Sequence, residues 1–190
     1  MLYFLIIFFL NQSRDIEKIY KKFIENKFLI KNKIMKILVT YYSRTGITKK
    51  AGEAIAEKLG AEIEEIKDTV DRSGAGGYVI SGRDALQKRL TKLEPSEKNL
   101  DDFDLVIIGT PIWGWNMSVP ARTYVTENKD KLKNVAFFCT MGGSGDKKAF
   151  LEMEKIIGKN PKAVLALKTV EVVKNNFLEK VEKFTEVLKK

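Results

Sequence analysis

The feature that most constrains the fold is an alternation of two hydrophobic patterns from residue 35 onward. Short apolar runs rich in β-branched residues predict buried strands, and apolar residues three or four positions apart predict helices. Strands are expected over 35–42, 61–66, 103–110, 134–140 and 162–170. Helices are expected over 48–60, about 77–90, 119–132, 146–158 and 175–190. This alternation predicts an α/β fold with a parallel sheet covered by helices on both faces.

Residues 1–34 do not share this pattern. The run of ten apolar residues at 1–10 is too short to cross a bilayer, which takes about 20 residues. It has no basic residues before it and no small-residue cleavage site after it, so it is a poor secretory signal. A membrane-surface anchor stays open as an alternative. We expect 1–34 to be either a disordered tail or an upstream extension outside the natural protein, and 35–190 to be the compact domain.

The composition excludes several kinds of chemistry. The chain has no histidine and a single cysteine, Cys139, which removes Ser-His-Asp and Cys-His catalysis and the usual zinc sites. We therefore predict no metal site, and an inert, packed Cys139. One cysteine cannot form an internal disulfide, which fits a reducing compartment, and the expected location is cytoplasmic. The net charge of +9 is scattered among acidic residues, so no nucleic-acid partner is predicted and a membrane partner is not favoured.

The first candidate site is the segment 43–48, Ser-Arg-Thr-Gly-Ile-Thr, between the first strand and the first helix. Unpaired backbone N–H groups and the positive end of the helix dipole meet there, and three hydroxyl side chains add donors. Together they would form a cradle for a phosphate monoester held without a metal. The alternative is an ordinary N-cap and tight turn. Arg44 could add charge to the site or simply be solvated.

Two further loops should meet the first one, because ligands bind beyond the carboxyl ends of parallel strands. Residues 110–118 carry Trp113 and Trp115, which either stack on a ligand or pack on a neighbouring loop. Residues 140–146 carry three glycines, whose backbone N–H groups could reach a polar ring edge. Their alternative is a simple surface turn.

In this order, the three loops resemble those of the flavodoxin-like family of FMN-binding proteins. Residues 43–48 match the family pattern [ST]-x-T-G-x-T in full, and the resemblance spans 35–190. It implies a three-layer α/β/α fold with a five-stranded parallel sheet of order 2-1-3-4-5, for which flavodoxin is itself the standard example. It also implies FMN as cofactor. The implied FMN-binding residues are Ser43, Arg44, Thr45, Gly46, Ile47, Thr48, Thr110, Pro111, Ile112, Trp113, Gly114, Trp115, Thr140, Met141, Gly142, Gly143, Ser144 and Gly145.

The sequence departs from the electron-carrier flavodoxins, many of which are strongly acidic and hold the flavin between two aromatic side chains. Here the domain is mildly basic, and the third loop supplies no aromatic residue. In both respects the chain is more similar to flavodoxin-like NAD(P)H-dependent reductases. We therefore expect an FMN-dependent oxidoreductase that takes electrons from a nicotinamide or a protein donor and passes them to a quinone or another small acceptor.

Two alternatives remain from the sequence: a non-enzymatic electron carrier between protein partners, and a binding module that holds no flavin. Catalytic side chains cannot be assigned, and Tyr78 is the one candidate for a proton donor or substrate contact. Its alternative is a core aromatic at a helix start. A homodimer is also compatible with the resemblance.

Overall fold

The computed structural model describes residues 18, 21–22 and 35–189. The chain divides into two units, Met1–Met35 and Lys36–Lys190. The expectations made above for 1–34 lie almost entirely outside the described residues. Among the described residues, the helices are all too short or too polar to cross a membrane.

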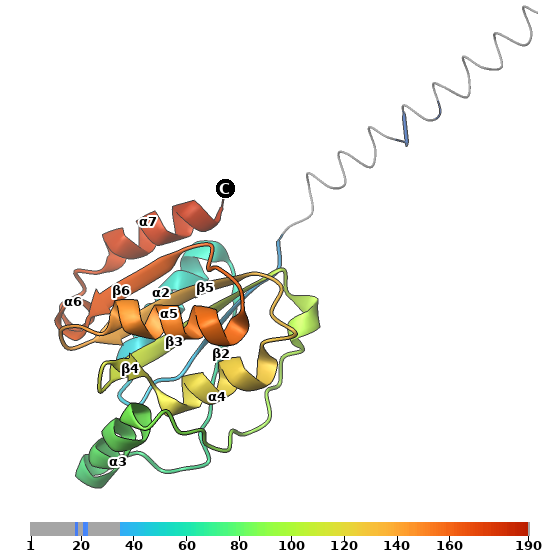
Figure 1. Cartoon of the computed structure of the whole chain (residues 1–190). Coiled ribbons are helices and arrows are strands. Elements are labelled where there is room, and N and C mark those ends of the chain that lie inside the picture. Colours follow the sequence, from blue (N-terminus) through green and yellow to red (C-terminus); the bar gives the residue numbers. More distant parts are fainter. Residues whose placement is uncertain (1–17, 19–20, 23–34, 190) are drawn as a thin grey trace, which may run out of the picture. The chain divides into compact units, whose positions relative to one another are not determined.

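The second unit is built on a parallel sheet, which confirms the predicted fold (Figure 1). Its five parallel strands are β1 (Ile37–Tyr41), β2 (Glu62–Glu65), β3 (Leu105–Trp113), β5 (Val135–Met141) and β6 (Val164–Lys168). They lie in the order β2-β1-β3-β5-β6, which is the predicted 2-1-3-4-5 order of the five parallel strands. In register, Pro111 lies opposite Thr140, and Met141 lies opposite Lys168. The carboxyl ends of three strands therefore meet at one edge.

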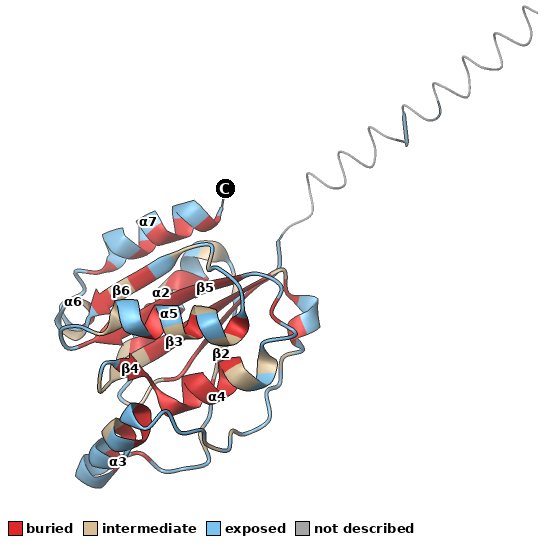
Figure 2. Cartoon of the chain, viewed as in Figure 1, coloured by how far each residue is buried: buried red, intermediate tan, exposed pale blue. Residues whose placement is uncertain are grey.

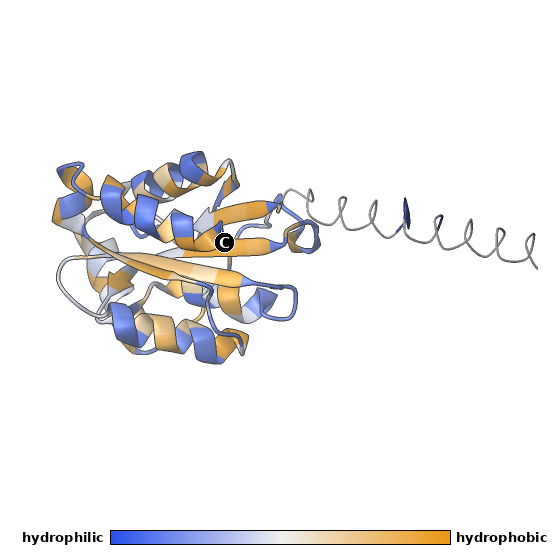
Figure 3. Ribbon diagram, turned by 90° about the horizontal axis from the view of Figure 1, so that it is seen from above, coloured by the Kyte–Doolittle hydropathy of each residue, from blue (hydrophilic) through white to orange (hydrophobic). Residues whose placement is uncertain are grey.

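Helices cover both faces of the sheet, and Figure 3 shows the apolar strands between two helical layers. Residues of α2 (Ile47–Leu59), α6 (Thr169–Val173) and α7 (Leu178–Leu188) share one core with one face of the sheet. Residues of α4 (Val119–Asn128) and α5 (Asp146–Ile157) share the other core with the opposite face. A 3-10 turn, η1, covers Leu100–Asp102, and α3 covers Gly74–Leu86.

The central strands are buried on both faces, as their continuous apolar runs predict. In β5, Phe137 packs in the core of α4 and α5, and its neighbour Phe138 packs in the core of α2 and α7. Gly109 in β3 lies directly beside Phe138, since a Cβ at that position would come within 2.1 Å of the ring. Figure 2 shows the resulting burial of the sheet and of the helix faces that contact it.

Two predicted segments differ in the structure. Residues 110–118 are a β-hairpin rather than a loop, because β3 runs on to Trp113 and pairs with the short antiparallel strand β4 (Asn116–Met117). The turn residues Gly114 and Trp115 both have positive φ, 53° and 59°, as a two-residue hairpin of the type I′ kind requires. This strand is an addition to the predicted five.

The helix expected over about 77–90 covers Gly74–Leu86 instead, so it includes the glycine-rich stretch. Gly77 explains the shift, since a Cβ there would lie 2.2 Å from the backbone of Arg72. The glycine allows the first turn of α3 to pack directly on the preceding segment. The helix ends early because Lys88 adopts a positive φ of 54° and the backbone turns back.

Candidate functional site

The turn between β1 and α2 forms the predicted cradle. Gly46 has a φ of 80°, which turns the chain into α2 and points the first N–H groups of the helix out of the turn. The first helical turn carries no acidic residue and no side chain that caps these groups. The Ser43 hydroxyl oxygen is buried and has no hydrogen-bond partner among the described residues. These donors are therefore available to an anion.

A buried pair of hydroxyls joins this turn to the end of β5. Thr48 Oγ1 lies 2.8 Å from Thr140 Oγ1. Both side chains are almost fully buried, so the pair is shielded from water. The link holds the first and third predicted loops together at the carboxyl edge of the sheet.

The hairpin places its two tryptophans differently. Trp113 is half-buried and meets the ring of Tyr42 edge to face, with centroids 5.5 Å apart. Trp115, at the turn, is exposed. Thr110 is fully buried and serves the hairpin, because its Oγ1 accepts from the Ser118 backbone N–H at 2.9 Å. One tryptophan thus forms a fixed wall and the other projects from the hairpin tip.

The turn after β5 leaves its backbone accessible. Gly142, Gly143 and Ser144 are exposed, and a side chain at either glycine would meet nothing within 4 Å. Gly145 is different. Its φ is 116°, and a Cβ added there would lie 2.8 Å from Ile112 Cγ2. It lets the hairpin and the start of α5 approach closely.

A buried charge cluster anchors α3 beside the hairpin. Arg72 Nε donates to Asp68 Oδ2 at 2.6 Å, and its Nη1 donates to Asp84 Oδ2 at 3.3 Å. The Arg72 guanidinium also lies 6.0 Å from the Trp113 ring centroid. Burial alone would raise the pKa of Asp84, but the hydrogen bonds from Arg83 and Arg72 outweigh it and lower that pKa. Asp84 is therefore ionised and holds α3 in place.

Between these elements lie two hollows that share lining residues. One, of about 270 Å³, lies over the cradle. The other, of about 540 Å³, lies between the hairpin, the 142–144 turn and α3, and has the size of a small-molecule site. The four shared residues are Tyr78, Ile112, Trp113 and Gly142. The two hollows therefore form one continuous cleft, which leads from the anion cradle to a broad apolar opening.

Most of the predicted site residues line this cleft. They are Arg44, Thr45, Ile47, Thr48, Tyr78, Pro111, Ile112, Trp113, Gly114, Trp115, Thr140, Met141, Gly142, Gly143 and Ser144. Gly46, Thr110 and Gly145 do not line the cleft. They fix the turn into α2, the hairpin and the close approach of α5, as described above. Ser43 lines an adjoining hollow together with Arg44.

Three lining residues were not predicted: Ser81 and Gly82 of α3, and Thr169 at the start of α6. Thr169 carried a usable signal, because it directly follows a strand that ends at the same edge. Ser81 is buried and its hydroxyl has no partner among the described residues. No sequence pattern marks it as a site residue.

Tyr78, the candidate catalytic residue, lies on α3 with its ring exposed, and Arg44 stacks on it at 5.0 Å from the centroid. It is therefore not a core aromatic. Cys139 is fully buried, and burial raises the pKa of its thiol to about 12. The thiol is protonated at neutral pH and has no nucleophilic role. Within the described part of the chain, no cluster of His, Cys, Asp and Glu side chains could hold a metal.

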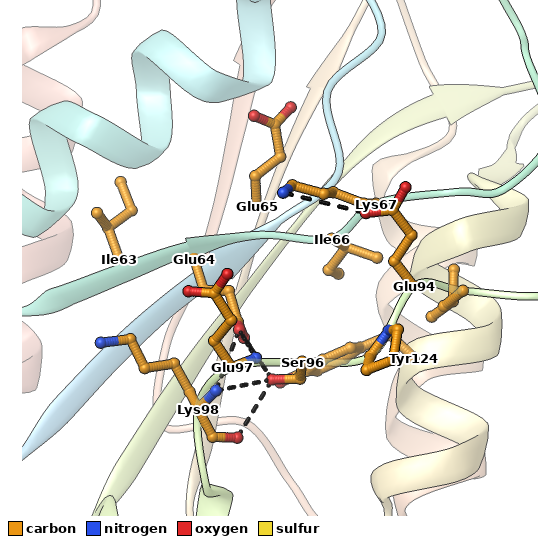
Figure 4. Close-up of a pocket in the computed structure, with 12 residues that line it drawn as sticks. Ile63, Glu64, Glu65, Ile66, Lys67, Glu94, Ser96, Glu97, Lys98 and Tyr124 are labelled. Carbon is orange, nitrogen blue, oxygen red and sulfur yellow. Dashed lines mark hydrogen bonds and ion pairs between the residues drawn. The ribbon is translucent and has the colours of Figure 1, made fainter.

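A separate cavity of about 240 Å³ lies beside the edge strand β2 and shares no lining residue with the cleft (Figure 4). Its central carboxylate, Glu64, accepts hydrogen bonds from the Ser96 hydroxyl and the Glu97 backbone N–H, both at 2.8 Å. The Lys98 backbone N–H donates to the same carboxylate at 3.2 Å. These bonds use the carboxylate to fix the 96–98 segment, so the cavity is a structural feature of that connection.

Comparison with known proteins agrees with this geometry. A family model described as flavodoxin matches residues 36–183. A flavoprotein from Lactobacillus acidophilus NCFM, solved in complex with FMN, is 27% identical, with a TM-score of 0.62 over 74% of this chain and 97% of that chain. A putative flavoprotein from Bacteroides eggerthii is 22% identical, with a TM-score of 0.60 over 78% and 98% of the two chains, and supports the fold. No curated protein matches the sequence.

Proposed function

Since the chain belongs to the flavodoxin family, we propose that it is an FMN-dependent oxidoreductase that uses this cleft. FMN is the cofactor, and it supplies the redox chemistry when bound. The observation that supports the proposal is the continuity of the cleft. The uncapped first turn of α2, with Thr45 and Thr48 lining the hollow over it, opens into a space walled by Trp113.

Each part of the cleft has a role in this proposal. The hydroxyls of Ser43, Thr45 and Thr48, with the N–H groups of Gly46 and Ile47, bind the phosphate. Trp113 would pack against the flavin ring, and its contacts with Tyr42 and Arg72 keep its side chain in position. The backbone N–H groups of the exposed residues 142–144 could donate to the polar edge of the flavin, where they would stabilise negative charge.

The 142–144 turn offers no aromatic side chain that would cover the other face of the flavin ring, so that face would stay open on this side. Tyr78 and Trp115 border that opening and would contact a nicotinamide, a quinone or another small acceptor. The alternative is an electron carrier between proteins. The exposed apolar side chains around the opening favour that alternative.

The test is the visible spectrum of the FMN-loaded protein without oxygen, before and after addition of NADH or NADPH. Rapid bleaching of the flavin band supports the reductase. A bound flavin that stays yellow supports the carrier, and failure to bind FMN contradicts both. The triple variant Ser43→Ala/Thr45→Ala/Thr48→Ala should lose at least about 100-fold in FMN affinity, because three hydrogen bonds to a charged group are removed. Unchanged affinity would place the phosphate elsewhere.

A further inference from the structure

The helix α3 buries small and polar residues and exposes large apolar ones, which is the opposite of the usual arrangement. Its buried residues are Gly77, Ser81, Asp84 and Ala85. Its outward side carries Tyr78, Val79 and Leu86, which are 64%, 68% and 57% exposed. An amphipathic helix normally turns its apolar stripe to the core. Figure 2 shows α3 as largely exposed, and more than half of the surface of each of these three side chains is open to solvent.

This apolar surface continues onto the hairpin tip. Leu86 lies against the turn, since its Cγ is 2.8 Å from where a Cβ of Gly114 would stand. Trp115 follows and is 61% exposed, and its positive φ is the one that the hairpin turn requires. Its large apolar ring therefore extends the exposed apolar side of α3 onto the hairpin tip. We call the surface formed by Tyr78, Val79, Leu86 and Trp115 the α3 patch.

Cations surround the α3 patch. On its own segment, Arg83 and Arg89 are half-exposed and share one carboxylate partner, Asp84, and at the cleft Arg44 stacks on Tyr78. Lys147 and Lys148 are exposed in the first turn of α5, directly after the 142–144 turn. Neither lysine forms an ion pair among the described residues.

The positions of these lysines are costly for the folded chain alone. A cation in the first turn of a helix opposes the helix dipole, and Lys49 and Lys50 repeat this arrangement in α2 on the other side of the cleft. Two acidic groups lie on these segments: Asp71, which is exposed, and Asp146 in the first turn of α5, which is half-buried, and they are fewer than the cations. The rim of the cleft is therefore positive, although positive charge there does not stabilise the fold.

We propose that the α3 patch and its basic rim dock an acidic redox protein over the cleft. The partner would present an apolar centre ringed by carboxylates, and electrons would pass between its redox centre and the flavin. A second copy of this chain fits poorly, because two basic rims would face each other. A small anionic donor would cover only part of a surface that runs from α3 to α5. This inference rests on the proposed function and names the partner for the same site.

The test uses two electron-transfer proteins of opposite charge with the FMN-loaded full chain. A reduced acidic [2Fe–2S] ferredoxin gives one electron per cluster to the flavin, and a basic cytochrome c takes one electron per haem from the reduced flavin. We expect the second-order rate constant with ferredoxin to fall at least about tenfold as salt is raised from low to physiological ionic strength. With cytochrome c, the rate should rise with salt.

Matched variants separate docking from folding. Lys147→Glu/Lys148→Glu should slow the reaction with ferredoxin about tenfold at low salt, and it should leave the helix intact because glutamate suits a first turn. Lys129→Glu/Lys131→Glu makes the same charge change at the far end of α4 and should have no effect. Val79→Ser should slow the reaction at every salt concentration, while Val187→Ser on α7 should not.

Equal effects of the two lysine pairs, or faster exchange with cytochrome c at low salt, would overturn the inference. So would a Lys147→Glu/Lys148→Glu variant that loses reduction by NADPH but keeps its reaction with ferredoxin, since the rim would then bind a small anion. A wild-type chain that elutes as a dimer dissociated by Val79→Ser would assign the patch to a second copy. An FMN titration of each variant separates the two cases. Loss of FMN binding by the wild-type chain would contradict the proposed function itself, whereas normal FMN binding with unchanged ferredoxin rates would contradict only the docking inference.

Discussion

Thr48 Oγ1 lies 2.8 Å from Thr140 Oγ1, and this buried contact joins the start of α2 to the end of β5. The two residues are 92 positions apart in sequence. Both are buried, so water could not take the place of either hydroxyl as a hydrogen-bond partner. The pair therefore holds the phosphate cradle and the glycine turn in one arrangement before any cofactor binds.

Replacing one member of this pair should destabilise the protein. Thr48→Val keeps the shape but leaves the Thr140 hydroxyl buried and unpaired, which costs about 1–3 kcal/mol in the free energy of unfolding. The Thr48→Val/Thr140→Val double variant should recover part of that loss, because both polar groups are then gone. Urea unfolding of the two single variants and the double variant measures the coupling. Additive losses would show that the contact contributes nothing.

Ser43→Ala should behave in the opposite way. The Ser43 hydroxyl is buried without a partner, so its removal should leave the free energy of unfolding of the cofactor-free protein unchanged within about 0.5 kcal/mol. FMN affinity should fall about tenfold, because one hydrogen bond to the phosphate is lost. A fluorescence titration with FMN and urea unfolding check the two parts. A loss of stability without a loss of affinity would contradict the assigned role.

Gly145→Ala should disturb the hairpin. The new Cβ would need a φ of 116° and would meet Ile112 Cγ2 at 2.8 Å and Trp115 Cα at 2.9 Å. We expect a loss of about 1–3 kcal/mol in stability and weaker FMN binding. Gly143→Ala, in the same turn but in open space, is the control for stability and should unfold like the wild type.

Acid should loosen the anchor of α3. The pKa of Asp84 is lowered in the folded state, so its contribution to stability is complete above about pH 4 and is lost as the pH falls through the folded-state pKa. Asp84→Asn should be less stable at neutral pH, because Arg72 loses an ionic partner, and should lose less stability on acidification. Urea midpoints across this range measure the difference. Asp130→Asn, on the surface after α4, should keep the pH dependence of the wild type.

The Cys139 thiol should be unreactive in the folded protein. With its pKa raised to about 12 by burial, almost none of it is thiolate at neutral pH. A disulfide reagent such as Ellman's should label it after unfolding in urea and not before. Rapid labelling of the native protein would contradict the burial.

Strand and helix periodicity predicted the alternating elements, and the composition of the loops after the strands marked the three candidate loops, because these signals are local. The sheet order and the list of FMN-binding residues came from the resemblance to the flavodoxin-like family, which the 43–48 motif carries. The sequence could not predict the role of Arg72, whose partners Asp68 and Asp84 meet it only after the chain folds. It also missed the hairpin, because Pro111 and Gly114 suggest a loop, whereas strand pairing across Gly114 and Trp115 forms a two-residue turn. Ser81 was missed because α3 buries small and polar residues rather than an apolar stripe, so its periodicity does not show which side faces the cleft.

The hairpin also gives the protein an optical property. Its two tryptophans, Trp113 and Trp115, are the only ones in the 190-residue sequence, and both line the cleft. All of the indole emission therefore originates beside the cofactor, where energy transfer to a bound flavin is efficient. The tryptophan fluorescence of the unlabelled chain is consequently a direct signal of whether the cleft is occupied, because no indole lies elsewhere in the sequence.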